Sequence, residues 1–291
     1  MRPNPLLLAT ASAKMEGDMY DWMQLCGRRD FLRWASEFIV TMHLPAMGRA
    51  RAQLSSARDK PARPEVVARF SHLRLQTHCL EELRVFYSKT IGLPIIADAA
   101  RSITFRAGAS AIEFVQVDDG SKPFYHFAFN VSENKFPLGK EWLKARCPLL
   151  RFPDGTDEIF FESWNAHATY FHDPAHNIVE FIARHTLANA APGPFGLDDI
   201  LCDSEIGLVA RHQEAASKAI TAAFGIEKYG TSHFFTGDAN GVFVIPPVGR
   251  LWIPEQKQPA TIFPTQVTIR SSEKPSLTFA DLPYEIRTAE S

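Results

Sequence analysis

Three short segments of the chain share one pattern, in which hydrophobic and polar positions alternate. The segments read HLRLQT from His72, HFAFNV from His126 and EIGLVA from Glu205. Alternation of this kind is typical of a β-strand with one face in the core. Each segment precedes a stretch whose hydrophobic residues recur at helical spacing, over residues 79–92, 135–146 and 212–225. The pattern therefore predicts a strand followed by a helix at three places in the chain.

More strand-like runs follow each of these helices. They are rich in β-branched and aromatic residues and contain the turn sequences AGAS, DPAHN and DANG, which suit β-hairpins. The predicted unit is a strand, a helix and three further strands, βαβββ, and it occurs three times. A shorter run, PTQVTIRSS at residues 264–272, indicates a partial fourth unit. Repeats of this kind predict an α+β fold built from duplicated modules.

Composition excludes several classes of protein. The chain has 291 residues, of which 45% are hydrophobic and 22% are charged, and its formal net charge is -2. A protein that binds nucleic acid would carry a basic stripe, so no nucleic-acid partner is expected. No hydrophobic run approaches the roughly 18 residues that a membrane-spanning helix needs. The four cysteines form no CxxC pair, so neither a disulfide framework nor a thiolate metal site is expected.

The first 68 residues differ from the rest of the chain. Residues 27–33, GRRDFLR, are followed by a weakly hydrophobic stretch and by Ala-Arg-Ala at 50–52, and these features resemble a twin-arginine export signal. Residues 53–68 indicate a linker. We therefore expect residues 1–68 to be a leader and linker, with the folded part beginning near Arg69. A periplasmic location, reached through this signal, and a cytoplasmic location both stay open.

The first two units resemble the vicinal oxygen chelate superfamily. The segments that carry the resemblance are HLRLQT, FYSKTIGLP, AIEFVQ, YHFAFNV and YFHDPAHNIVEFI, within residues 70–185. This superfamily includes glyoxalase I, fosfomycin- and bleomycin-resistance proteins, methylmalonyl-CoA epimerase and extradiol dioxygenases. The resemblance implies that two βαβββ modules pair into a cup of curved sheet with a divalent metal ion inside. We expect residues 69–190 to hold the paired modules 1 and 2 with this metal site, and residues 191–291 to hold a third module and the partial fourth without metal ligands.

Four residues at equivalent places in the first two units are the predicted metal ligands. His72 and His126 begin the first strands, each opposite the hydrophobic stripe, and Glu113 and Glu180 lie in the last strands. Imidazole nitrogens and carboxylate oxygens suit Zn, Ni, Co, Mn or Fe(II). Each of these residues alone is more often a solvated side chain, so the prediction depends on their recurrence in register. In the third unit Glu205 stands where the His would be, and that unit is expected to serve packing or substrate enclosure.

A small-molecule substrate is the expected partner, and four further residues are predicted to contact it. Arg74 and Asn130 share strand faces with the two histidines, and His167 and Tyr170 lie in the strand that leads to the Asp-Pro turn. A pocket needs only a few such polar groups to orient its ligand. The resemblance to glyoxalase I, whose chains pair, leaves a homodimer open.

Three functions stay open at this point. In a glyoxalase-I-like isomerase or lyase, two His and two Glu hold the metal, and Glu113 or Glu180 removes the proton next to a substrate carbonyl. An extradiol-type dioxygenase needs two His and one carboxylate around Fe(II), which His72, His126 and Glu180 would supply. A non-catalytic binding or resistance protein usually lacks the full ligand set. The presence of Glu113 favours the first function.

Overall fold

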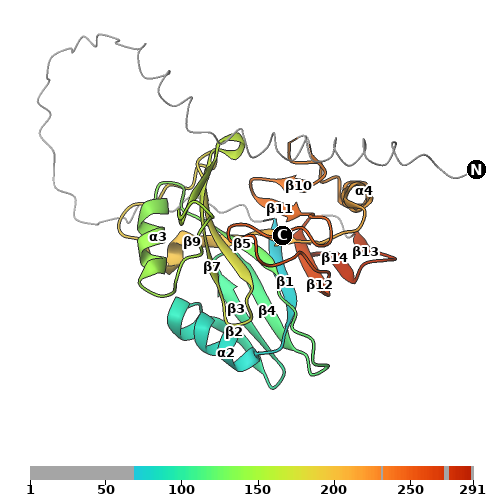
Figure 1. Cartoon of the computed structure of the whole chain (residues 1–291), viewed down its shortest axis with the longest axis horizontal. Coiled ribbons are helices and arrows are strands. Elements are labelled where there is room, and N and C mark those ends of the chain that lie inside the picture. The colour runs from blue at the N-terminus through green and yellow to red at the C-terminus, as the bar shows by residue number, and fades with distance from the viewer. Residues whose placement is uncertain (1–68, 231, 272–274, 290–291) are drawn as a thin grey trace, which may run out of the picture. The chain divides into compact units, whose positions relative to one another are not determined.

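The structure is a computed structural model that describes residues 69–230, 232–271 and 275–289 (Figure 1). The expected leader and linker, residues 1–68, lie outside the described residues, and the predicted export signal lies there with them. The described chain forms two seven-stranded β-sheets with few helices, which confirms the predicted α+β fold of repeated modules in curved sheets. No helix in the described ranges is long and apolar enough to cross a membrane.

The first two modules have the predicted βαβββ order. In the first strand Leu73 and Leu75 are fully buried, whereas Arg74 between them is exposed. The first helix continues as a short π-helix and ends at Gly92, whose φ of 92° lies in the left-handed region that suits glycine. Module 1 comprises β1 (Phe70–Thr77), α2 (Leu80–Val85), η1 (Phe86–Ile91), β2 (Ile95–Ala99), β3 (Ser102–Ala107) and β4 (Ser110–Gln116). Module 2 comprises β5 (His126–Val131), α3 (Phe136–Lys144), β6 (Ile159–Phe161), η2 (Glu162–Trp164), β7 (Ala166–His172) and β8 (Ile178–Arg184).

The third and fourth modules are shorter than the first two. Module 3 lacks one predicted strand, because residues 227–230 form only an isolated bridge, from Lys228 to Thr236, and Gly230 turns the chain with a φ of 83°. The strand expected at Glu205 begins earlier, at Ile200. Module 3 comprises η3 (Leu197–Asp199), β9 (Ile200–Gly207), α4 (Gln213–Phe224), β10 (Phe235–Asp238) and β11 (Gly241–Val244), and module 4 comprises β12 (Thr265–Arg270), β13 (Ser276–Thr278) and β14 (Tyr284–Ala289).

Strand order shows which modules share a sheet. Sheet A has the order β13-β14-β12-β1-β4-β3-β2, and sheet B has the order β10-β11-β9-β5-β8-β7-β6. Module 1 therefore pairs with module 4 through β1 and β12, and module 2 pairs with module 3 through β5 and β9. This corrects the expected pairing of module 1 with module 2. The alternation of hydrophobic residues specifies which face of a strand is buried, but it does not specify which of several similar strands completes the hydrogen bonds.

The main hydrophobic core is formed by one face of each sheet. Phe70 of sheet A packs against Phe243 of sheet B with ring centroids 5.0 Å apart, and Phe114 meets Phe127 at 6.5 Å. The other face of sheet A, here called its open face, is partly exposed along β1. The other face of sheet B, here called its cup face, is buried, since every residue of β5, β8 and β9 is buried. Charged residues on the cup face therefore need partners or a ligand.

Candidate metal centre

Three ionisable side chains meet on the cup face of sheet B. The Nε2 atom of His126 lies 3.6 Å from Glu180 Oε2 and 3.8 Å from Glu205 Oε2. The three residues are only 6%, 2% and 3% exposed, in the same order. Within the described ranges they form the one group of three or more His, Cys, Asp or Glu side chains that could hold a metal ion. We call this group the His126 cluster.

The sheet register explains why these side chains meet. Ala128 of the central strand β5 is the direct partner of Glu180 on parallel β8 and of Glu205 on antiparallel β9. His126 lies two residues before Ala128, and alternate residues of a strand point to the same face. The small Ala128 side chain leaves room between the two carboxylates, and the imidazole of His126 closes the third side.

Hydrogen bonding fixes the orientation of His126. Its Nδ1 atom lies 3.0 Å from the backbone carbonyl oxygen of Ile178. Because a carbonyl oxygen can only accept, Nδ1 carries a proton, and Nε2 is the ring nitrogen that faces Glu180 and Glu205. This arrangement is typical of histidines that bind metal ions, whose second ring nitrogen usually donates to a carboxylate or carbonyl group.

Glu180 is the least compensated member of the cluster. Its Oε1 atom is buried and has no hydrogen-bond partner among the described residues. Burial raises the pKa of Glu180 well above its ordinary value, the nearby Glu205 raises it further, and Arg184 partly opposes the shift. Tyr170, the direct partner of Glu180 on β7, interacts with this carboxyl group through its hydroxyl. A buried carboxyl oxygen without a partner marks a position that a ligand could fill.

Arg184 holds the other carboxylate. This side chain is fully buried and donates hydrogen bonds to Glu205, to Asn130 Oδ1 at 2.9 Å and to Ser204 Oγ at 2.9 Å. The register between β5 and β9 shifts next to Ala128, and Arg184 bonds both Ser204 and Glu205 beside this irregularity. The guanidinium group therefore orients Glu205 and neutralises one of the two negative charges.

The geometry of the His126 cluster fits a divalent metal ion. Two ligand atoms that each lie about 2.1 Å from a shared ion, at a tetrahedral angle, are about 3.4 Å apart. The separations of 3.6 and 3.8 Å are close to this value. Three protein ligands would leave open positions for water or for a substrate oxygen. The positive charge of Arg184 opposes metal binding, and the uncompensated Glu180 favours it.

Trp252 closes the cup above His126. Its indole ring lies 5.1 Å from the imidazole ring, centroid to centroid, and the residue is 5% exposed. Gly207 permits this contact, since a Cβ atom there would lie 3.0 Å from the indole. Trp252 lines a cavity of about 10 Å³ together with His126, and an outer cavity of about 270 Å³ together with His172 and Glu255. The indole therefore separates the cluster from the outer cavity.

The structure puts His72 and Glu113 in the other sheet. They lie on the open face of sheet A, where His72 Nε2 is 3.5 Å from Glu113 Oε2. The four residues predicted as one metal site thus form two separate pairs, His72 with Glu113 and His126 with Glu180. Arg74, predicted to contact substrate, donates instead to Glu113 Oε1 at 2.6 Å. A metal role for His72 and Glu113 stays a prediction, and the guanidinium group of Arg74 opposes it.

The other predicted substrate residues fall in different places. Asn130 and Tyr170 lie on the cup face beside the cluster, where Asn130 accepts from Arg184 and Tyr170 interacts with Glu180. His167 lies apart from them, with its Nδ1 atom 2.8 Å from Nε2 of His185. Contact of any of these residues with substrate stays a prediction.

Sequence reasoning missed Arg184 and Trp252 and gave Glu205 no ligand role. Arg184 follows Glu180 by four residues, so both lie on the same face of an otherwise hydrophobic strand. The presence of a second charged residue, Arg184, on the same strand face as Glu180 could have indicated its role. Trp252 lies in the irregular segment between β11 and β12, where no periodic pattern indicates its position.

Comparison with known proteins supports the fold. A protein from Bacillus subtilis that is provisionally assigned as a dioxygenase aligns with 77% of this chain and 86% of its own, with a TM-score of 0.50 and 14% sequence identity. The chain has the fold of the vicinal oxygen chelate superfamily. A glyoxalase I variant from Zea mays aligns with 77% of this chain and 94% of its own, with a TM-score of 0.47 and 13% identity. A lactoylglutathione lyase from Agrobacterium tumefaciens aligns with 40% of this chain and 95% of its own, with a TM-score of 0.33 and 16% identity. No family model and no curated protein matches the sequence. The similarity to the Bacillus subtilis protein, at 14% identity, shows the fold alone, so the activity has to be argued from the site.

Proposed function

We propose that the protein is a metal-dependent enzyme whose divalent ion is held by His126, Glu180 and Glu205. The observation that carries the proposal is the convergence of one imidazole nitrogen and two carboxylates on a buried face, with one carboxyl oxygen left unpartnered. Buried charges are costly unless they are paired or coordinate a metal. Arg184 compensates Glu205. Burial raises the pKa of Glu180, and a bound cation would displace the proton and compensate this second carboxylate.

We assign the reaction to the glyoxalase-like class, an isomerisation or lyase step on a small oxygenated substrate. A divalent ion at the cluster would polarise a substrate carbonyl group and stabilise the charge that develops when the neighbouring proton leaves. Glu180 is the proposed proton acceptor, because its buried Oε1 atom has no hydrogen-bond partner among the described residues and so has a lone pair open to accept the proton. Tyr170 positions the Glu180 carboxylate, and Trp252 keeps bulk water from the cup.

An extradiol-type dioxygenase is the second candidate. Three protein ligands are the number that such an enzyme uses, and the fold is similar to that of the Bacillus subtilis protein provisionally assigned as a dioxygenase. The donor set favours the first candidate, because non-haem Fe(II) oxygenases use two histidines and one carboxylate, whereas this cluster has one histidine and two carboxylates. Carboxylate oxygens suit Mn²⁺ and Mg²⁺, whereas imidazole suits Zn²⁺, Fe²⁺ and Ni²⁺.

Metal loading of the purified full chain tests the proposal. The protein is incubated with Mn²⁺, Zn²⁺, Ni²⁺ or Co²⁺, passed through a desalting column and analysed for metal by mass spectrometry. The wild type should retain about one ion per chain, and His126→Ala and Glu205→Gln should retain less than about a tenth of that, since each removes one of three ligands. Both variants should keep the circular dichroism spectrum of the wild type.

His72→Ala and Glu113→Gln are the matched controls, because they remove the equivalent pair in sheet A. Both should retain metal at the wild-type level. A wild-type protein that retains none of the four ions would show that the cluster is held by Arg184 alone and would favour a non-catalytic binding protein. Metal loss in His72→Ala, with retention in His126→Ala, would move the site to sheet A.

A further inference from the structure

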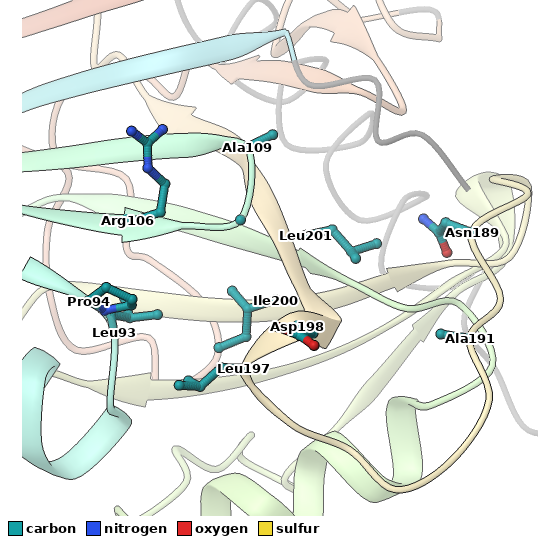
Figure 2. A pocket seen from close by; sticks show the side chains of 11 residues that line it. Leu93, Pro94, Arg106, Ala109, Asn189, Ala191, Leu197, Asp198, Ile200 and Leu201 are labelled. Atoms are coloured by element: carbon teal, nitrogen blue, oxygen red, sulfur yellow. The ribbon is translucent and has the colours of Figure 1, made fainter. Parts of the chain in front are cut away.

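A cavity of about 540 Å³ lies apart from the His126 cluster and shares no lining residue with it. On one side it is bounded by Leu93, Pro94 and the end of β3 with its turn into β4, and on the other side by residues 189–201, which lead into β9 (Figure 2). Its volume is within the range of pockets that bind small molecules, about 300 to 1,000 Å³. Nothing in the proposed reaction uses this cavity.

The walls of the cavity are mostly hydrophobic and closely packed. Leu197, one of the lining residues, is 39% exposed. A Cβ atom on Gly108 would lie 2.0 Å from the Leu201 carbonyl oxygen, so the β3–β4 turn rests directly on β9 and the wall is preformed. The apolar lining residues are Leu93, Pro94, Ala109, Ala191, Leu197, Ile200 and Leu201.

Two arginines stand at the rim next to sheet A. Arg106, on β3, lines the cavity and is exposed (Figure 2), and its guanidinium group has no ion-pair partner within the described ranges. Arg270, on β12, reaches past β1 and donates from Nη2 to the carbonyl oxygen of Ala109 at 2.8 Å. Ala109 itself lines the cavity. Arg106 and Arg270 therefore both border the end of the cavity that is next to sheet A.

The remaining cations near this edge are already compensated. Arg74 is paired with Glu113, with 2.6 Å between Nη1 and Oε1. Arg287 donates to both oxygens of Glu285, at 2.6 and 2.7 Å. Arg106 and Arg270 are the positive charges that no carboxylate of the described chain balances at this rim. An arginine fork is well suited to bind a carboxylate or another oxyanion.

We propose that this cavity binds an amphipathic organic anion, a small molecule with a hydrocarbon or aromatic body and one carboxylate group. The body would lie against Leu197, Ile200 and Leu201, and the carboxylate would accept hydrogen bonds from Arg106, with Arg270 adding positive charge. The acid group would then lie on the side of the cavity opposite the wall that includes Asp198. The site is independent of the metal centre and does not depend on the proposed reaction.

The test compares two probes that differ only in their head group. Octanoate and 1-octanol are titrated against the full chain at low ionic strength, and dissociation constants are taken from saturation-transfer NMR. Octanoate should bind more tightly than octanol. Arg106→Gln should weaken octanoate binding roughly fivefold, the scale of one lost charge-assisted hydrogen bond at a partly solvated site, and should leave octanol binding unchanged. Leu197→Ser should weaken both probes.

The control is Arg101→Gln, which removes an exposed arginine next to β3 that is ion-paired with Asp118 at 2.6 Å. It should change neither dissociation constant by more than about twofold, as expected for a surface pair. Arg270→Gln repeats the head-group test from a second strand. Equal affinity of the wild type for both probes, or octanoate binding that survives both arginine substitutions, would overturn the proposal.

Discussion

Replacing Asp173 should change how the stability of the protein depends on pH. Asp173 is buried in the DPAHN turn, where its carboxyl group accepts from the Tyr87 hydroxyl at 2.7 Å, from Asn177 Nδ2 at 2.7 Å and from the backbone N–H groups of Ala175 and Asn177. Burial raises its pKa from the ordinary value of 3.8 to about 6, although these hydrogen bonds oppose the shift. The folded protein therefore holds a proton that the unfolded chain releases between these two pH values.

The sign and size of the effect follow from this difference. Below pH 3.8 the carboxyl group is protonated in both states, and its contribution to stability is fully present. As the pH rises to 6 the unfolded chain ionises first, so the contribution is lost. A shift of about two pKa units corresponds to roughly 3 kcal/mol. Because the unfolded chain is already partly ionised at pH 4, the free energy of unfolding should fall by roughly 2 kcal/mol of this amount between pH 4 and 6, relative to a variant that cannot titrate.

Asp173→Asn is that variant, and urea denaturation of both proteins between pH 4 and 7 is the assay. The difference in unfolding free energy, wild type minus variant, should fall by roughly 2 kcal/mol between pH 4 and 6 and level off by pH 7. Asp281→Asn, at an exposed aspartate, is the surface control. A constant difference for Asp173→Asn would mean that Asp173 binds its proton equally well in the folded and unfolded states, and that burial does not dominate at this position.

Three further substitutions test the packing around the site and the fold. Trp252→Ala should join the two cavities that the indole borders, so a chelator should remove metal from the loaded protein at least ~10-fold faster. The same change should lower the free energy of unfolding by about 3 to 5 kcal/mol. An unchanged rate would show that the chelator reaches the metal by another route. Asp199→Ala should lower the free energy of unfolding in urea by about 3 to 5 kcal/mol, because it leaves the buried ammonium group of Lys135 without its carboxylate. The double variant with Lys135→Met should recover part of that loss. Gly108→Ala should destabilise the protein by more than about 1 kcal/mol in the same assay, since its Cβ would collide with the Leu201 carbonyl and its φ is 54°; wild-type stability would mean that the β3–β4 turn is free to move.

Much of the fold could be predicted from local patterns. Alternation identified β1 and β5, Pro137 falls in the first turn of α3, and Gly225 ends α4 in the left-handed conformation. Pairing between modules could not be predicted in the same way, because duplicated units present similar strand edges to one another. The short segment that begins near residue 265 forms β12, which pairs with β1 in sheet A. Its length alone did not indicate this pairing.

The candidate site could be predicted only in part. Glu180 does have a histidine partner, His126, as its place in a hydrophobic strand suggested. The third ligand candidate, Glu205, depends on the pairing of β5 with β9 and could not be found without it. One local difference did hold information: the residue two places after His72 is Arg74, whereas the residue two places after His126 is Ala128. In each sheet this residue is the direct partner of the glutamate, so an arginine there meets the carboxylate and an alanine leaves it free.

A diffraction measurement tests the central claim most directly. Crystals of the full chain loaded with Mn²⁺ or Zn²⁺ would be measured at the absorption edge of the metal, where anomalous differences locate the ion. The account predicts one strong peak on the cup face of sheet B, about 2.0 to 2.2 Å from His126 Nε2 and from one oxygen each of Glu180 and Glu205. A peak between His72 and Glu113 on sheet A, or loaded crystals in which Arg184 bridges Glu180 and Glu205 with no ion between them, would contradict it.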